Sequence, residues 1–337
     1  MGDHHVAIVG ATGLVGQEFI KILEQRRFPM ASVRLLASDR SVGKMLRVND
    51  QDIAVEQTVP DAFSGVDIAL FSAGADISLR FSPIAAEAGA LVVDNSSAFR
   101  MDPGVPLVVP EVNPEDIAQH RGIIANPNCS TIQMVVALYP LHRVNPIRRL
   151  TAATYQAVSG AGTPAVEELR TESRTVLEGG QAIARVYPYQ IAFNVLPEID
   201  VFLENGYTKE EWKMVEETRK IMHEPGLAIS ATCVRVPVHT GHSEAVQVEF
   251  SHPMSVEEAK EILERAPGVV VMDHPAARVY PYPAMAAGRD EVFVGRIRKD
   301  SSHPNGLALW IVSDNLRKGA ALNTIQIAEE AIRRQLV

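Results

Sequence analysis

The sequence has few cysteines, few aromatic residues and no long apolar run. Only Cys129 and Cys233 are cysteines among its 337 residues, which is too few for a disulfide framework and is typical of a reducing compartment. No apolar run is long enough to cross a bilayer, and the N-terminus continues into the apolar residues 6–9 without a signal-type segment. These absences predict a cytoplasmic protein with no membrane partner.

Basic clusters are also missing. The chain has 32 Lys and Arg against 41 Asp and Glu, a net charge of -9, so a nucleic-acid partner is not expected. With 46% hydrophobic residues, a chain of this length can bury the cores of two domains. No repeat, low-complexity tract or linker marks a boundary, so we expect the boundary in a short connection.

A strand, a glycine turn and a helix follow one another at the N-terminus. Gly10, Gly13 and Gly16 lie between the apolar run 6–9 and the amphipathic pattern at 18–23. In a dinucleotide-binding turn the first glycine permits the tight bend, the second lets backbone approach the pyrophosphate, and the third allows close helix packing. Because the spacing is G-x-x-G-x-x-G and not the commoner G-x-G-x-x-G, a purely structural turn remains an alternative.

The second expected strand, residues 33–37, ends where the adenosine ribose of a dinucleotide would lie. Arg40 with the hydroxyls of Ser38 and Ser41 would suit a 2′-phosphate, whereas Asp39 would suit a free 2′-hydroxyl. Both alternatives stay open. The guanidinium and two hydroxyls favour NADP.

Further apolar runs alternate with helical or turn segments up to about residue 128. They predict strands at 68–71, 91–94, 107–109 and 123–125. This alternation indicates a Rossmann-type, doubly wound parallel sheet, in which ligands bind at the carboxyl ends of the strands. Polar residues occupy those ends, at 72–74, 95–97 and 128–129.

After about residue 150 the pattern becomes that of a sheet with one covered face. Alternating or β-branched runs predict strands at 151–157, 228–236, 245–250, 292–297 and 307–312. Helical patterns lie at 166–177, 209–222 and 256–265. This half is predicted to be an α+β domain, and a last helix at 320–336 could return to pack on the first domain.

Two residues suggest covalent chemistry. Cys129 follows a strand-like run and the turn Asn126-Pro-Asn128, and it opens a helical pattern. The helix N-terminus favours a thiolate nucleophile, although the same pattern would also fit a cysteine that is only a small buried hydrophobic residue. His242 is a candidate acid/base partner, with His239 as its competitor. No third ligand completes a metal site with them, so no metal is expected.

Charged residues suggest where an anionic substrate binds. Arg235 lies in a largely apolar strand and Arg100 lies just past a strand end, so each is a candidate anion site. Glu210 and Lys213 are three apart in a helical pattern, which is more typical of an exposed ion pair.

Seven motifs follow one another along the chain: residues 10–16 (GATGLVG), 95–97 with Arg100, 126–131 (NPNCST), 154–160 (TYQAVSG), 210–213 (EEWK), Arg235 with His242, and 314–323 (DNLRKGAALN). Together and in this order, they resemble the motifs of aspartate-β-semialdehyde dehydrogenases. The resemblance implies an NADP-binding domain at 1–128, completed by a C-terminal helix at 315–337, and a catalytic and dimerisation domain at 129–314. It also implies a homodimer.

The resemblance assigns roles residue by residue. It implies that Cys129 is the nucleophile, His242 the acid/base catalyst, Gln156 the residue that orients the acyl group and Asn128 an assistant at the thiol. Substrate would be held by Arg235 at its carboxylate, Glu210 at its amino group, and Arg100 and Lys213 at its phosphate. The cofactor residues would be Gly10, Thr12, Gly13, Leu14, Val15, Ser38, Arg40, Ser41, Ser72, Gly160 and Asn315.

The implied reaction is reductive dephosphorylation of L-aspartyl 4-phosphate to L-aspartate 4-semialdehyde, in lysine, threonine and methionine biosynthesis. Asp39 replaces the small residue expected between Ser38 and Arg40, which weakens a strict preference for NADP. N-acetyl-γ-glutamyl-phosphate reductase is the nearest alternative, but its substrate has no ammonium to partner Glu210. A non-catalytic dinucleotide-binding paralogue is the alternative from another class.

Overall fold

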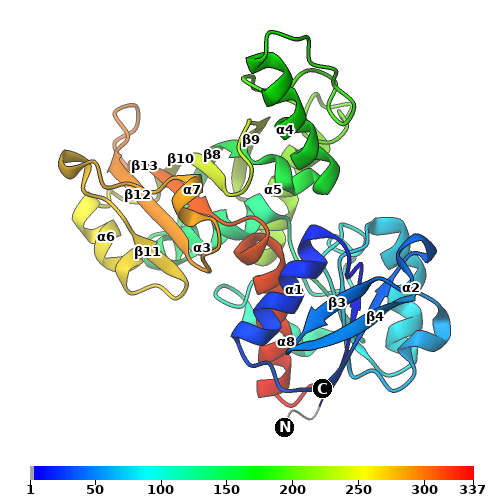
Figure 1. The fold of residues 1–337 in the computed structure, drawn as a ribbon. Coiled ribbons are helices and arrows are strands. Elements are labelled where there is room, and N and C mark those ends of the chain that lie inside the picture. Colours follow the sequence, from blue (N-terminus) through cyan, green and yellow to red (C-terminus); the bar gives the residue numbers. More distant parts are fainter. Residues whose placement is uncertain (1–3) are drawn as a thin grey trace. The chain divides into compact units, whose positions relative to one another are not determined.

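The computed structural model describes residues 4–337 and divides into two compact units. Of the described residues, the first unit comprises 4–128 together with 320–337, and the second comprises Cys129–Gly319. Each unit has its own β-sheet (Figure 1). None of the helices in the described part of the chain is long and apolar enough to cross a membrane.

The first unit has a seven-stranded sheet in the order β3-β4-β2-β1-β5-β6-β7. Its strands are β1 (His4–Val9), β2 (Met30–Ala37), β3 (Met45–Val48), β4 (Gln51–Gln57), β5 (Ile68–Phe71), β6 (Leu91–Asp94) and β7 (Ile123–Ala125). All neighbours are parallel except β3 and β4. The strand order reverses at β1, between β2 and β5, so the predicted doubly wound fold is confirmed.

Two details of this sheet differ from the prediction. Residues 107–109 form only an isolated bridge from Leu107 to Ala125, because the flanking Pro106 and Pro110 have no N–H to extend a ladder. The β3–β4 hairpin was not predicted, since its short strands are polar and its turn is signalled only by residues 49–50, both with positive φ.

Helices α1 (Leu14–Gln25), α2 (Ala75–Glu87) and α8 (Leu322–Arg333) belong to this unit. Phe19 and Ile22 of α1 share one buried apolar cluster with Ile325 and Ala328 of α8. The C-terminal helix, which follows a π turn (Arg317–Ala321), therefore contributes to the core of the first unit.

The second unit has a six-stranded mixed sheet in the order β11-β12-β13-β10-β8-β9. Its strands are β8 (Ile147–Gln156), β9 (Ala228–Arg235), β10 (His242–Phe250), β11 (Val269–Val271), β12 (Val292–Lys299) and β13 (Gly306–Ser313). Helices α3 (Cys129–Val144), α5 (Lys209–Ile221) and α6 (Val256–Glu264) pack against its strands. Along β10, residues 242, 244, 246, 248 and 250 are buried while 245, 247 and 249 are partly exposed. One face is thus covered, as the predicted α+β domain requires.

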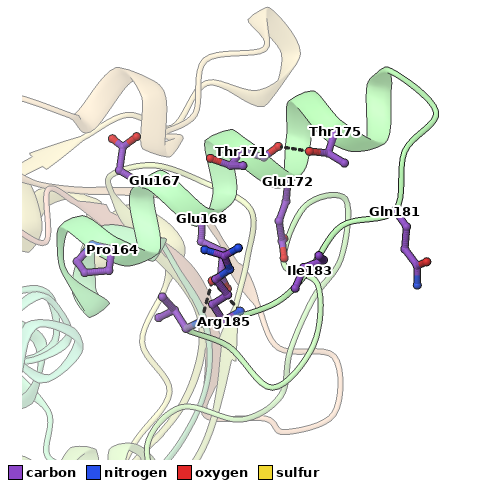
Figure 2. Close-up of a pocket in the computed structure, with 10 residues that line it drawn as sticks. Pro164, Glu167, Glu168, Thr171, Glu172, Thr175, Gln181, Ile183 and Arg185 are labelled. Carbon is purple, nitrogen blue, oxygen red and sulfur yellow. Dashed lines mark hydrogen bonds between the residues drawn. The ribbon is translucent and has the colours of Figure 1, made fainter.

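Two carboxylates of helix α4 (Thr163–Leu177) hold the loop that follows it (Figure 2). Glu168 accepts hydrogen bonds from the backbone N–H groups of residues 185–187, and Glu172 accepts from those of residues 191 and 192, at 2.6 to 3.1 Å. A cavity of about 540 Å³ lies between the helix and the loop. These five bonds fix a segment that has no regular structure of its own, and they place Tyr187.

Candidate functional site

The register of the second sheet brings distant polar residues into one buried row. Gln156 on β8 pairs with Arg235 on β9, and His242 on β10 pairs with Ser313 on β13. The antiparallel register of β8 and β10 makes Gln156 and His242 neighbours as well. All four side chains are at most 5% exposed. Four strands from widely separated parts of the chain therefore build one polar row on the covered face.

His242 is held as a neutral imidazole. Its Nδ1 accepts a hydrogen bond from the Ala157 N–H at 3.0 Å, which leaves the ring proton on Nε2. Burial and, to a lesser extent, the nearby Arg235 guanidinium lower the pKa of His242 to about 3, against an opposing effect of Glu210. His239 is exposed. Of the two candidates, His242 alone lies in the buried row.

Arg235 and His242 both face Gly160. A Cβ atom on Gly160 would lie 3.2 Å from Arg235 Nη1 and 3.4 Å from His242 Nε2. The same Nη1 donates to the Ala157 carbonyl at 2.7 Å, and the guanidinium carbon lies 6.0 Å from the centre of the Tyr187 ring. Loop 157–160 therefore packs directly over the row.

Three buried polar atoms at this place have no hydrogen-bond partner among the described residues. They are Arg235 Nε, His242 Nε2 and the Tyr187 hydroxyl. Buried polar groups are nearly always paired, so a cluster of such atoms indicates a position where a polar ligand completes the bonding. All three groups can donate a hydrogen bond and the guanidinium is cationic, so together they suit an anionic or carbonyl oxygen.

Glu210 and Lys213 belong to a largely buried network on α5. Glu210 accepts from Gln156 Nε2 at 3.1 Å and from Lys213 Nζ at 3.1 Å, while Lys213 also binds Asp200 at 2.8 Å. Glu210 is only 6% exposed. The interpretation as an exposed surface pair is therefore wrong, because α5 packs on β9 and turns Glu210 toward the covered face. Gln156 is fixed at its other end by Thr154, which donates to its Oε1 at 3.0 Å.

Asn315 ties two loops of the second unit together. Its Oδ1 accepts from the Gly241 N–H at 2.8 Å, and its Nδ2 donates to Ser159 Oγ at 2.9 Å. Gly241 precedes His242, and Ser159 precedes Gly160. Asn315 consequently sets the positions of both the imidazole and the loop opposite it.

Cys129 is the first residue of α3, and its side chain is partly exposed. Gly319 approaches it so closely that a Cβ atom there would lie 2.8 Å from the Cys129 Cβ. Cys233, in contrast, is fully buried with its Sγ 3.6 Å from Met214 Sδ, and burial raises the pKa of its thiol well above the ordinary value. Of the two thiols, Cys129 is the one with access to a reactant.

The glycine turn of the first unit has the geometry of a phosphate-binding turn. Gly10 has φ of 87°, and a Cβ atom there would lie 2.5 Å from the Ser72 carbonyl oxygen. A Cβ atom on Gly16 would lie 2.2 Å from the Gly10 oxygen, so only glycine fits at either position. Helix α1 begins at Leu14 and Val15 after Gly13, with no side-chain cap. Its first N–H groups are therefore open to a bound phosphate.

The loop after β2 forms a short 3-10 turn, Asp39–Ser41. Asp39 Oδ1 accepts from the Arg40 N–H at 2.8 Å, so its carboxylate stabilises its own turn. Arg40 and Ser38 are exposed, while Ser41 is buried with its hydroxyl 3.4 Å from that of Thr12. The hydroxyl contact connects this loop to the glycine turn.

Arg100 binds the ends of two neighbouring strands of the first unit. Its Nε donates to the Asn126 carbonyl at 2.9 Å and its Nη2 donates to the Asn95 carbonyl at 3.0 Å. Asn126 also exchanges amide hydrogen bonds with Asn95 and with Asn323 of α8, both at 2.7 Å. Asn128, the last residue of the N-terminal segment of this unit, is buried. Besides any contact with an anion, Arg100 thus holds the strand ends in place.

Some residues of the site carry no signal in the sequence. Tyr187 and Asp200 lie in irregular segments, and they reach Arg235 and Lys213 only through the folded loop after α4. Ser159 and Gly319 lie within the noted motifs, but their contacts with Asn315 and Cys129 depend on tertiary packing. Only a motif-independent signal such as covariation would have indicated these pairs.

Comparisons with known proteins agree across the whole chain. Residues 5–120 match the family model described as semialdehyde dehydrogenase, NAD binding domain, and residues 138–318 match the one described as semialdehyde dehydrogenase, dimerisation domain. Aspartate-semialdehyde dehydrogenases of Aquifex aeolicus and Bacillus subtilis are 55% and 52% identical to it, each over 99% of both chains.

Solved structures agree as well. Aspartate semialdehyde dehydrogenase II of Vibrio cholerae complexed with ASA superimposes with a TM-score of 0.96, at 48% identity over 99% of both chains. The Candida albicans aspartate semialdehyde dehydrogenase with NADP gives a TM-score of 0.77 at 28% identity, also over 99% of both chains.

Proposed function

The chain belongs to the aspartate-semialdehyde dehydrogenase family, as its motifs predict, and we propose that it reduces L-aspartyl 4-phosphate to L-aspartate 4-semialdehyde through a Cys129 thioester. The reaction is a step toward lysine, threonine and methionine. The observation that supports it most is the buried row of Arg235, Gln156 and His242, in the same unit as a partly exposed cysteine at a helix N-terminus.

The proposed reaction proceeds through a covalent intermediate on Cys129. The Cys129 thiolate attacks the acyl carbon, the C–O bond to phosphate breaks, and phosphate leaves with both electrons. The resulting thioester would accept the hydride that a reduced nicotinamide supplies when bound, and would become a thiohemiacetal anion. Its collapse re-forms the carbonyl and expels the Cys129 thiolate, which is then ready for the next turnover.

His242 would stabilise the oxyanion through a hydrogen bond from Nε2. The acid/base role expected from sequence needs a ring that gains and loses a proton, whereas burial, Arg235 and the Ala157 N–H all favour the neutral form. A neutral Nε2–H still donates to an oxygen that carries developing negative charge. Since the thiohemiacetal anion collapses directly to the aldehyde, this step needs no proton from His242.

Substrate recognition would use the charged neighbours of the row. Arg235 is proposed for the α-carboxylate, because its Nε is a buried donor with no partner among the described residues and guanidinium groups suit carboxylates. Glu210 is proposed for the ammonium group, with Gln156, bonded to it, at the acyl group. The phosphate is proposed to be bound by Arg100 and Lys213, and the thiol to be assisted by Asn128.

The first unit is proposed as the cofactor domain and the second as the catalytic domain. Crowding at Gly10 and Gly16 and the uncapped start of α1 fit a dinucleotide pyrophosphate. NADP is proposed over NAD because the Asp39 carboxylate accepts a hydrogen bond from the Arg40 N–H within its own turn, whereas the Arg40 side chain is exposed next to Ser38. The nicotinamide, when bound, supplies the hydride, and Gly160 and Asn315 are proposed to lie beside it.

A homodimer is proposed through the open face of the second sheet. Tyr155 and Trp310 lie on this face with ring centroids 5.3 Å apart, and Tyr155 is 39% exposed. Exposed aromatic residues on a sheet are typical of an interface core. A cytoplasmic location is also proposed, because both cysteines are free thiols and the mechanism requires Cys129 to remain reduced.

A substrate and cofactor panel tests the proposal. Initial rates of the phosphate-dependent oxidation of aspartate semialdehyde, N-acetylglutamate semialdehyde and glyceraldehyde 3-phosphate are compared with NADP and with NAD. We expect aspartate semialdehyde with NADP to have the highest kcat/KM. A preference for N-acetylglutamate semialdehyde would support the alternative reductase, and no turnover of any substrate would support a non-catalytic paralogue.

A further inference from the structure

Glu244 is a fully buried carboxyl group that the proposed mechanism does not use. It lies two residues after His242 on β10, on the same covered face, with Thr154 of β8 beside it. Its exposed fraction is 0%, and neither carboxyl oxygen has a hydrogen-bond partner among the described residues. It therefore belongs to a second buried layer, one position further along the same face than the row of Arg235, Gln156 and His242.

Helix α3 brings a complementary group to the same layer. Gln133 is fully buried, its Oε1 accepts from Ser313 Oγ at 2.7 Å, and its Nε2 has no hydrogen-bond partner among the described residues. Ser313 is the cross-strand neighbour of His242. Gln133 is also one helical turn after Cys129, on the same side of α3. One amide thus connects the nucleophile helix to the strands that carry the row.

The charge state of Glu244 follows from its surroundings. Burial raises the pKa of Glu244 well above the ordinary value, and the Gln133 amide, which lies near the carboxyl group without meeting hydrogen-bond geometry, opposes this only in part. The titratable and charged groups on the packed elements include His242 on its own strand, Cys129 on α3, Cys233 and Arg235 on β9, and Glu210 and Glu211 on α5. The three carboxyl groups all act on Cys233, and no cation contributes to the shift of Glu244.

We propose that Glu244 is a positioning residue whose neutral carboxyl group, set against Gln133, holds helix α3 at the depth that presents Cys129 to the row containing His242. A protonated carboxyl group can both donate and accept, as the primary amide of Gln133 can. An ionised carboxylate could not donate and would be a buried charge without a counterion. The catalytic consequence rests on the proposed function, but the protonation state and the placement of Cys129 can be measured independently of it.

The first test measures urea unfolding of the full chain at fixed protein concentration between pH 5.5 and 8.5. Wild type is compared with Glu244→Gln, and Glu249→Gln is the control because Glu249 lies on the other face of β10 and pairs with Arg149. As pH rises above the unfolded pKa of Glu244, the unfolded chain releases a proton that the folded chain retains, so wild type and Glu249→Gln should both lose stability relative to Glu244→Gln. The folding constant of wild type relative to Glu244→Gln should fall by up to about tenfold per pH unit. A ratio that stays constant with pH overturns the proposal.

The second test asks whether Glu244 positions the thiol. Under conditions where every variant is folded, iodoacetamide alkylation of Cys129 and kcat are compared for wild type, Glu244→Leu and Glu244→Gln. Leucine should lower both rates by about tenfold or more, because small misplacements of a reacting group are costly. Glutamine should restore both to within about twofold, since it keeps the volume and the polarity.

If the folded Glu244→Leu protein has the same alkylation rate and the same kcat as wild type, the positioning role is contradicted. If Glu244→Leu does not fold, Gln133→Leu tests the same contact from the helix side, with the same expected losses. Wild type could instead show no turnover, while its Cys129 is alkylated faster than that of Glu244→Leu and its folding constant relative to Glu244→Gln falls with pH. That result would contradict the proposed function but would support the Glu244 proposal.

Discussion

The Ala157 N–H donates a hydrogen bond to His242 Nδ1 at 3.0 Å. This contact sets the tautomer of the imidazole and leaves Nε2 as the donor that faces Gly160, which Arg235 also approaches. A protonated ring would place an N–H at Nδ1 against the Ala157 N–H, so the same contact disfavours the imidazolium ion. The backbone of one strand end therefore determines the chemistry available at the end of its neighbour.

The neutral state of His242 has a measurable effect on stability. The pKa of His242 is lowered to about 3, so below pH 6.5 the unfolded chain binds a proton that the folded chain does not. Wild type should therefore lose stability relative to His242→Asn by about 1.4 kcal/mol for each pH unit below 6.5. Urea unfolding of both proteins from pH 7.5 to 5 measures this difference, and parallel pH profiles would show that His242 titrates normally.

Replacement of the two histidines separates the buried candidate from the exposed one. His242→Asn should lower kcat by about 10²–10⁴, with a smaller change in KM, because the donor acts on the developing oxyanion. His239→Asn should have much less effect, since His239 is exposed on the connection before β10. Steady-state kinetics of both variants provides the test, and the reverse pattern would place the catalytic role on His239.

Arg235 and Arg100 are assigned to different anions of one substrate. Arg235→Lys keeps the charge but loses the planar fork, so it should raise KM for aspartate semialdehyde. Arg100→Lys should mainly raise KM for phosphate. Because Arg100 also binds two strand ends, we expect its replacement to lower the melting temperature as well. The opposite assignment of the two KM effects would require the two roles to be exchanged.

Cofactor preference depends on the loop after β2. Arg40→Ala should raise KM for NADP far more than KM for NAD, because the guanidinium is proposed to meet the 2′-phosphate. Asp39→Ala should shift the preference only modestly toward NADP, because the Asp39 carboxylate is bonded to the Arg40 N–H in its own turn. Equal or better use of NAD by wild type would make Asp39 the ribose ligand.

The sequence predicted the strands of both sheets better than their arrangement. Apolar runs and period-2 alternation identified all strands of the second sheet except the short β11, and the glycine turn identified the start of the first. Strand order depends on contacts between residues far apart in sequence, so the row of Arg235, Gln156 and His242 could not be derived from spacing. The motifs identified these residues as site residues, but they did not predict which residues would lie next to one another.

Local chemistry explains the other differences. The run 107–109 has the composition of a strand, yet the prolines on either side prevent a ladder. Glu210 and Lys213 have the spacing of a surface pair, yet packing of α5 on β9 buries the carboxylate. Tyr187 and Asp200 lie in segments without periodicity, and their positions depend on the carboxylates of α4 and on Lys213.

The most direct test of the account is a burst experiment without phosphate. Aspartate semialdehyde and NADP are mixed with the enzyme, and NADPH formation is followed by absorbance while the protein is analysed by peptide mass spectrometry. The thioester mechanism predicts a burst of about one NADPH per active site and an aspartyl adduct on Cys129, because the acyl enzyme has no phosphate to accept its acyl group. Cys129→Ser should abolish the burst, and Cys233→Ala, at the buried thiol, should keep it. A full burst in Cys129→Ser, or phosphate-dependent turnover by wild type with no burst and no adduct, would contradict covalent catalysis by Cys129.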